Sequence, residues 1–157
     1  WALKGQQPTV KTSGKRKAYK VFGLIDYFSG RFFCKAQTGR FNSDSYAAFL
    51  LEVLAEKVPI ILIQDGARYH TSKQMNEFFA AHADRLTRYQ LPSYSPDFNP
   101  IEFLWKKIRK RATHLKFFAE FERLVEKVEE ALQHFANLPS EITSLMGMYC
   151  SSLGQAS

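Results

Sequence analysis

A short run of apolar residues, Ile60 to Ile63, constrains the fold of this chain more than any other feature. The run is too short for a helix and has no polar alternation, which indicates a strand covered on both faces in a parallel or mixed sheet. Gln64 and Asp65 follow it directly. In open α/β sheets ligands bind outside the carboxyl ends of the strands, so Asp65 lies where chemistry is expected. An Asp before Gly66 is also typical of a turn that leaves a strand.

The other patterns predict strands and helices around this run. Two segments rich in aromatic and β-branched residues flank a Ser29-Gly30 turn signal and predict a hairpin over 19–28 and 31–37. Asp26, beside that turn, is interpreted as a turn former rather than a metal ligand. Helices are predicted over 42–54, 72–82, 100–112 and 119–135, with a strand over 85–91 and one short helix near 142–148. We expect an α/β fold with a mixed central sheet flanked by helices, in one domain spanning 1–157.

A proline-punctuated loop leads into the helix predicted to begin at Pro100. Proline fixes φ near the helical value, and Asn99 before it is a good N-cap residue. Glu102 then falls on the first turn, beside the positive end of the helix dipole, which favours an ionised carboxylate. Two interpretations of Glu102 stay open: it is half of an active site, or it forms a capping box with Asn99.

The basic character of the chain favours a polyanionic partner. The formal net charge is +7, and nucleic acid is the commonest partner for such a protein. The predicted helix from Pro100 carries most of its basic residues away from its apolar stripe, and one arginine follows Asp65 closely. We expect phosphate contacts from Arg68, Lys106, Lys107, Arg109 and Lys110. The alternative is that the helix merely presents a solvated face.

Several classes of protein are not indicated. No run approaches the roughly 20 apolar residues of a transmembrane helix, and no signal-peptide profile is present, so we expect a cytoplasmic protein without a membrane partner. Cys34 and Cys150 lack a metal-type spacing and are interpreted as inert packing residues.

Two segments carry a resemblance to a known family: Leu62–Ser72 and Leu91–Glu102, with Trp105 after the second. The second contains the string Ser-Pro-Asp-X-Asn-Pro-X-Glu. Together with the order of the predicted elements, they resemble the mariner-like superfamily of DDE transposases and its bacterial insertion-sequence relatives. The resemblance implies a ribonuclease-H-like fold. It also implies the catalytic core of a DNA transposase, with metal-dependent phosphodiester hydrolysis and strand transfer at transposon ends.

The resemblance assigns roles to particular residues. Asp65 and Glu102 would be the second and third carboxylates of a catalytic triad that binds two Mg²⁺ or Mn²⁺ ions through oxygen ligands. His70 and Asn99 would act around these carboxylates, although a lone His at a helix start is usually a local hydrogen-bonding residue. Gly66 stands where the family often has Asn, which we expect to adjust the hydrogen bonds around Asp65.

One part of the family pattern is not found in this sequence. The first Asp of the triad belongs to a strand upstream of the segment that begins at Trp1, and Asp26 lies on the wrong strand to replace it. We expect that strand, and the family's N-terminal helix-turn-helix region, to lie outside this chain. The chain alone would then bind DNA weakly and cleave it poorly or not at all.

The expected partners are transposon-end and target DNA, with a homodimer assembled on DNA and no small-molecule substrate. Two alternatives stay open. One is a truncated, catalytically inactive paralogue that acts as a DNA-binding or subunit-interaction module. The other is a stand-alone nuclease of the same fold, which would cleave without joining.

Overall fold

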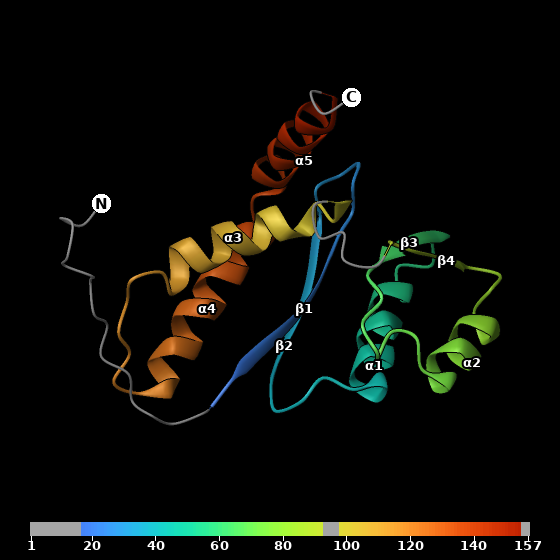
Figure 1. Cartoon of the computed structure of the whole chain (residues 1–157), viewed down its shortest axis with the longest axis horizontal. Helices are drawn as coiled ribbons and strands as arrows, with labels where there is room; N and C mark the ends of the chain where they lie inside the picture. The colour runs from blue at the N-terminus through green and yellow to red at the C-terminus, as the bar shows by residue number, and fades with distance from the viewer. Residues whose placement is uncertain (1–16, 93–97, 155–157) are drawn as a thin grey trace.

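The structure, a computed structural model, describes residues 17–92 and 98–154, with side chains up to residue 147. Its elements follow in the order β1 (Tyr19–Ile25), β2 (Phe32–Thr38), α1 (Ser43–Leu54), β3 (Ile60–Gln64), α2 (Lys73–Ala81), β4 (Leu86–Gln90), α3 (Ile101–Ala112), α4 (Phe121–Ala136) and α5 (Pro139–Gly154). Figure 1 shows the β1–β2 hairpin between two groups of elements. One group holds α1, α2, β3 and β4, and the other holds α3, α4 and α5. This content confirms the predicted α/β class.

The predicted hairpin is present as an antiparallel pair, and its turn is built around Asp26. The Asp26 carboxylate accepts the backbone N–H groups of Phe28 at 3.0 Å and Ser29 at 3.3 Å, and the Ser29 hydroxyl at 2.6 Å. These hydrogen bonds, the Ser29 hydroxyl first, hold the pKa of Asp26 below its ordinary value. Gly30 completes the turn with a φ of +72°, a conformation that favours glycine. Asp26 is a turn former, as predicted.

The hairpin contributes side chains to two cores, because successive side chains of a strand point to opposite faces. One face packs into a first core with α1, α2, β3 and β4 through Phe22, Leu24 and Phe33. The other face packs into a second core with α3, α4 and α5 through Val21, Ile25, Phe32, Cys34 and Ala36. The hairpin therefore lies between the two cores and packs against both.

Side-chain caps begin the two helices of the first core, as predicted. Asn42 accepts the N–H of Ser45 at 2.8 Å, and the Ser45 hydroxyl accepts the N–H of Asn42 at 3.1 Å, which forms a capping box at α1. The Ser72 hydroxyl accepts the N–H of Met75 at 3.2 Å at the start of α2. The hydroxyls of Ser43 and Ser72 lie 2.8 Å apart. The two helix starts are thus joined to each other.

β3 and β4 form a parallel pair in register along their lengths. Leu62 is buried in the first core, but Ile61 is 72 % exposed and Ile63 is 61 % exposed. The prediction that this strand is covered on both faces is wrong. Helices of the first core pack against one face only, and within the described residues nothing buries the other.

The hydrogen-bonded ladders differ from the single mixed sheet that was expected. Among residues 17–92 and 98–154, β1 pairs only with β2 and β3 pairs only with β4. One pair is antiparallel and the other parallel, and both supply side chains to the first core. Each of these four strands therefore has one edge without a strand partner in the described part of the chain.

The second core is helical on its side away from the hairpin. Three residues of α3 are buried in it, as the helical spacing predicted: Leu104, Ile108 and Ala112. α5 has 16 residues, much longer than the short helix predicted near 142–148. Its apolar residues Ile142, Leu145 and Met146 recur at helical spacing and are buried here. Packing of these residues in the second core stabilises a longer helix than the small and polar residues of this segment predicted.

A tight contact positions α3 on the hairpin. A Cβ atom at Gly23 would lie 2.5 Å from Cη2 and Cζ2 of the Trp105 indole. The same indole packs edge-on against Phe32, with ring centroids 5.8 Å apart. Gly23 thus leaves the space that Trp105 occupies, and this contact sets where the first turn of α3 lies.

Replacing Gly23 with alanine should destabilise the fold by about 1–3 kcal/mol, because the new methyl group must displace the Trp105 ring from a packed core. Urea unfolding followed by circular dichroism measures the change. Gly147→Ala in α5 is the matched control, since a Cβ there meets nothing within 4 Å and alanine is the better helix former. A Gly23→Ala variant as stable as the parent chain would refute the importance of this contact.

Candidate active site and nucleic-acid interface

Asp65 follows the last residue of β3 and lies at the carboxyl end of the β3–β4 pair. Its Oδ1 accepts the backbone N–H of Ala67 at 3.0 Å, which turns the chain away from the strand. The side chain is nevertheless 57 % exposed. The turn therefore engages one carboxylate oxygen and leaves the group accessible to a ligand.

His70 holds the same carboxylate from the direction of the first core. Its Nδ1 lies 2.9 Å from Oδ1 of Asp65 and 3.2 Å from the Asp65 carbonyl oxygen. The imidazole is buried and packs against the rings of Tyr46 and Tyr69, with centroids 4.2 and 4.3 Å away. Packing restricts rotation of the ring, so His70 fixes the orientation of the Asp65 carboxylate.

The hydrogen bonds around Asp65 favour its ionised form. The bond from His70 lowers the pKa of Asp65 below its ordinary value, assisted by the Ala67 N–H and opposed by partial burial. Burial also raises the pKa of the neighbouring phenols: that of Tyr69 rises to about 12, and that of Tyr46 rises too. The cluster thus combines an ionised carboxylate with neutral aromatic walls at neutral pH.

Glu102 lies in the first turn of α3, as predicted. Pro100 precedes the helix with a φ of −62°, and the helix itself begins at Ile101. The predicted cap by the Asn99 side chain is wrong, because Pro100 takes the N-cap position and none of the described side chains caps this helix. Asn99 instead uses its carbonyl oxygen, which accepts the Glu102 N–H at 3.0 Å. The capping box is therefore absent, and the Glu102 carboxylate has no partner among the described residues.

Asp65 and Glu102 belong to elements of different cores. Asp65 extends from β3 in the first core and Glu102 begins α3 in the second. The connection between them includes residues 93–97 of the resemblance motif, which lie outside the described residues. In the part of the chain that the structure describes, no three His, Cys, Asp or Glu side chains are grouped so as to hold a metal ion. The structure joins Asp65 with His70, and its convergence with Glu102 stays a prediction.

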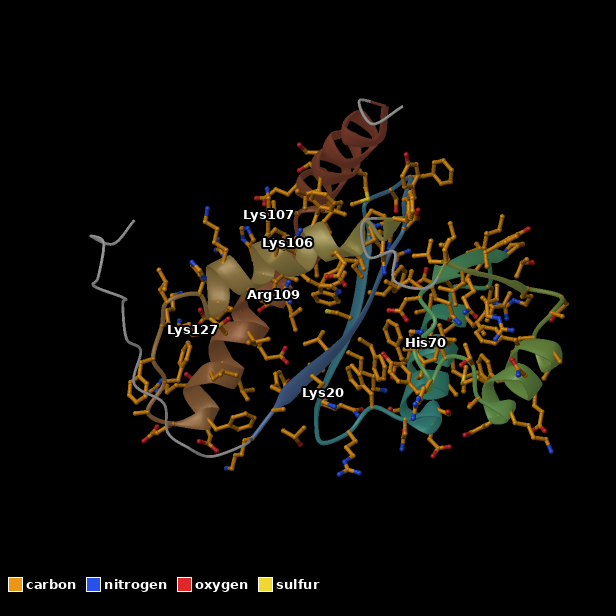
Figure 2. The ribbon with its side chains drawn as sticks, in the orientation of Figure 1. Lys20, His70, Lys106, Lys107, Arg109 and Lys127 are labelled. Atoms are coloured by element: carbon orange, nitrogen blue, oxygen red, sulfur yellow. The ribbon has the colours of Figure 1, made fainter. Side chains whose placement is uncertain are left out.

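The exposed side of α3 carries five basic residues: Lys106, Lys107, Arg109, Lys110 and Arg111. None of them forms an ion pair with a carboxylate of the described residues; Lys106 instead lies over the Phe103 ring, 5.2 Å from its centroid. Figure 2 shows Lys106, Lys107 and Arg109 along α3, away from the group of elements that holds His70. We call these five residues the α3 cationic face.

Carboxylates elsewhere are engaged locally. Three ion pairs of this kind are Arg31 with Glu56, Lys35 with Glu52, and Lys127 with Glu130. Glu129 accepts the hydroxyl of Tyr19. The acidic groups near the hairpin and on α4 are thus occupied, which leaves the α3 cationic face available for an external anion. Arg68, in the turn after Asp65, is also exposed and without a described partner.

Two residues beside Asp65 were not predicted as site residues. The hydroxyl of Tyr46 donates to Oε1 of Gln64 at 2.6 Å, and both side chains are buried. Nε2 of Gln64 is buried without a hydrogen-bond partner among the described residues. The sequence pattern indicates Tyr46 only as part of a helix's buried face. Its polar contact depends on how α1 packs across β3, for which the sequence has no local signal.

Comparison with known proteins finds relatives of this arrangement. Residues 1–125 match the model of a family described as DDE superfamily endonuclease. The insertion element IS630 uncharacterized 39 kDa protein of Shigella sonnei is 27 % identical over 145 residues, which cover 88 % of this chain and 41 % of that protein. The chain thus spans less than half the length of this curated relative.

Two solved structures share the fold. The Mos1 transposase paired-end complex with the left transposon end matches with a TM-score of 0.57 and 15 % identity, covering 94 % of this chain and 49 % of that one. The catalytic domain of Mos1 mariner transposase matches with a TM-score of 0.53 and 11 % identity, covering 87 % of this chain and 80 % of that one. These similarities confirm the ribonuclease-H-like fold.

The Asp65–His70 contact predicts a specific pH dependence. His70→Phe keeps a ring between the tyrosines but removes the hydrogen bond, so the pKa of Asp65 should rise. A carboxyl group whose folded pKa is depressed stabilises the fold above its unfolded pKa, and this stabilisation is lost as pH falls through the folded pKa. Carboxyl-carbon NMR titration measures the shift. Asp26, held by Ser29, is the internal control and should not move. An unchanged pKa of Asp65 in His70→Phe would mean that His70 does not lower it.

Proposed function

Because the chain belongs to the DDE superfamily endonuclease family, we propose that it is the catalytic core of a DNA transposase. Its reaction is metal-dependent hydrolysis of phosphodiester bonds at transposon ends, followed by strand transfer. The observation that carries this proposal is Asp65, an ionised and accessible carboxylate oriented by His70 at the carboxyl end of β3. The fold shared with a transposase bound to a transposon end supports DNA as the partner.

The residues fit a divalent metal ion, which this family generally uses. The carboxylates of Asp65 and Glu102 are the ligands that we assign to Mg²⁺ or Mn²⁺, since both ions prefer oxygen ligands. The lowered pKa of Asp65 favours the ionised carboxylate that a metal ligand needs, and no described side chain competes with a metal ion for Glu102. When bound, a pair of such ions activates the attacking oxygen and stabilises the leaving one.

The protein's own groups position the reactants. His70 and the Ala67 N–H engage Oδ1 of Asp65, so the carboxylate keeps one orientation. The α3 cationic face and Arg68 hold the phosphate backbone, which sets the register of the DNA without reading its sequence. The nucleophile is water in cleavage and a DNA 3′-hydroxyl in joining, and no covalent protein intermediate is needed. Among the described contacts, Asn99 acts through its backbone carbonyl oxygen, which accepts the Glu102 N–H.

The domain proposed is a single ribonuclease-H-like DDE domain over residues 1–157, whose sheet is completed by a strand in addition to the four described. Support comes from the two separate strand pairs, whose strands each have one edge without a described partner. Isolated two-stranded pairs are marginal, and open apolar edges attract further strands. A strand that joined the two pairs would unite the sheet, and we assign the first Asp of the triad to it, since Asp65 and Glu102 are the second and third carboxylates.

The assembly proposed is a homodimer on DNA, since joining two transposon ends requires two active sites. We also propose that the protein works in the cytoplasm, associated with the nucleoid if the source is prokaryotic, without a membrane partner or a small-molecule substrate. Among the helices of residues 17–92 and 98–154, none is both long enough and apolar enough to cross a membrane.

A second candidate is a catalytically inactive paralogue that serves as a DNA-binding or subunit-interaction module. The observation that favours it is the lack of any three-residue metal group in the described part of the chain. Both candidates bind DNA through the α3 cationic face. They differ in whether a longer protein that carries this chain cleaves DNA through Asp65 and Glu102.

Asp65→Asn and Glu102→Gln should each reduce Mn²⁺-dependent nicking of supercoiled plasmid by more than about 100-fold in that longer protein. Replacing a residue that only hydrogen-bonds to a metal ligand typically lowers activity about 10–100-fold, and replacing the ligand itself should lower it further. Gel electrophoresis measures nicking, and DNA affinity in EDTA should be unchanged. Asp44→Asn is the control, because Asp44 is an exposed acid on α1 bonded to Gln74. Nicking retained in either site variant would exclude the assignment.

The Lys106→Ala/Lys107→Ala variant should flatten the salt dependence of DNA affinity. Each phosphate contact contributes about 0.9 to the slope of log affinity against log salt, so two lost contacts should reduce the slope by roughly 1.8. Fluorescence anisotropy over a salt series measures it. Lys127→Ala is the matched control, since Lys127 pairs with Glu130. An unchanged slope in the double variant would mean that these lysines are solvated and do not contact phosphates.

A further inference from the structure

Gly66 and Gln90 meet at the carboxyl end of the β3–β4 pair, beside Asp65. Gln90 is the last residue of β4 and stands in register with Gln64, the last residue of β3. A Cβ atom built on Gly66 would lie 3.0 Å from Nε2 of Gln90 and 3.8 Å from its Cδ. The end of the Gln90 side chain thus lies over the residue that follows Asp65.

The backbone does not explain the glycine at position 66. The described glycines with positive φ are Gly30 and Gly39, and Gly66 is not among them. Any residue could adopt its conformation, so the distinguishing property of Gly66 is the space that it leaves. The Gln90 carboxamide occupies that space.

The Gln90 carboxamide is available to a ligand. Its neighbour in register, Gln64, is buried and accepts the Tyr46 hydroxyl. Gln90 is exposed, and its carboxamide has no hydrogen-bond partner among the described residues. The two glutamines therefore end the paired strands with different environments: one supports the core, and the other faces the edge where ligands bind in α/β sheets.

We propose that the Gln90 carboxamide donates a hydrogen bond to a non-bridging phosphate oxygen of DNA held at Asp65, and that Gly66 leaves the room for it. This inference rests on the function proposed above. A neutral amide suits the position because it donates to the phosphate without competing for a cation with Asp65, whereas a carboxylate there would repel the phosphate. Gln90 is in this sense a substrate-positioning residue.

The test compares DNA affinity of this chain in Mn²⁺ and in EDTA, using a short fluorescent duplex and anisotropy. Gln90→Ala should reduce the affinity in Mn²⁺ about tenfold, the order expected for one hydrogen bond to a charged group. Gln90→Glu should reduce it further. Affinity in EDTA, which the α3 cationic face supplies, should not change. Thr87→Ala, an exposed change on the same strand, should alter neither value.

Gly66→Ala tests the geometry, because its methyl group displaces only the flexible end of Gln90. It should lower the affinity in Mn²⁺ measurably but by a smaller factor than Gln90→Ala, since it only shifts the carboxamide, and the thermal unfolding midpoint should not change. The double variant should lose no more than Gln90→Ala alone, since both changes affect one interaction. Additive losses, or a Gln90→Ala variant with full affinity in Mn²⁺, would overturn the proposal.

The assay separates this inference from the function on which it rests. If Asp65→Asn loses the Mn²⁺-dependent affinity while Gln90→Ala retains it, the metal site stands and the role of Gln90 is refuted. If Mn²⁺ does not raise the affinity of the parent chain, both the metal site in this chain and the role of Gln90 are refuted.

Discussion

The packing of Trp105 on Gly23 ties the two halves of the structure together. The β1–β2 hairpin supplies side chains to both cores, and α3 is positioned on it through this contact. A shift of one residue in the pairing of the hairpin would move the side chains of the shifted strand to the opposite face. Such a shift would misplace side chains in both cores, so the packing of both cores opposes it. The start of α3, which carries Glu102, is therefore fixed by the same packing that stabilises the fold.

Charge is distributed unevenly over this framework. Ion pairs and hydrogen bonds engage the acidic groups near the hairpin and on α4, whereas the α3 cationic face has no described acidic partner. The contacts of Asp65 with His70 and Ala67 lower its pKa and so favour its ionised form. Screening limits surface charges to a range of about 10 Å in moderate salt. The cations of α3 can therefore attract a polyanion that approaches this face of the protein.

Features set by neighbouring residues were predictable from the sequence. The caps at Asn42 and Ser72, the turn at Asp26 and the strand end at Asp65 each depend on residues only a few positions apart. Two predictions that were wrong depend on tertiary contacts: the cover over β3 and the length of α5. The cap on α3 was also wrong, although it would involve only neighbouring residues, because Pro100 takes the N-cap position. The hold of His70 on Asp65 also requires the packing of Tyr46 and Tyr69, which brings distant segments together.

Glycine shows why part of the candidate site was hidden. Gly30 has a positive φ that a turn signal reveals, whereas Gly23 and Gly66 serve by leaving space for Trp105 and Gln90. No local sequence pattern reveals a glycine that leaves space for a side chain, because the residue that fills the space lies far along the chain. The consequences differ as well. Trp105 is a rigid ring packed in a core, while the end of Gln90 is flexible and exposed. The placement of Glu102 is therefore coupled to stability, whereas the Gln90 side of the Asp65 site can vary without disturbing a core.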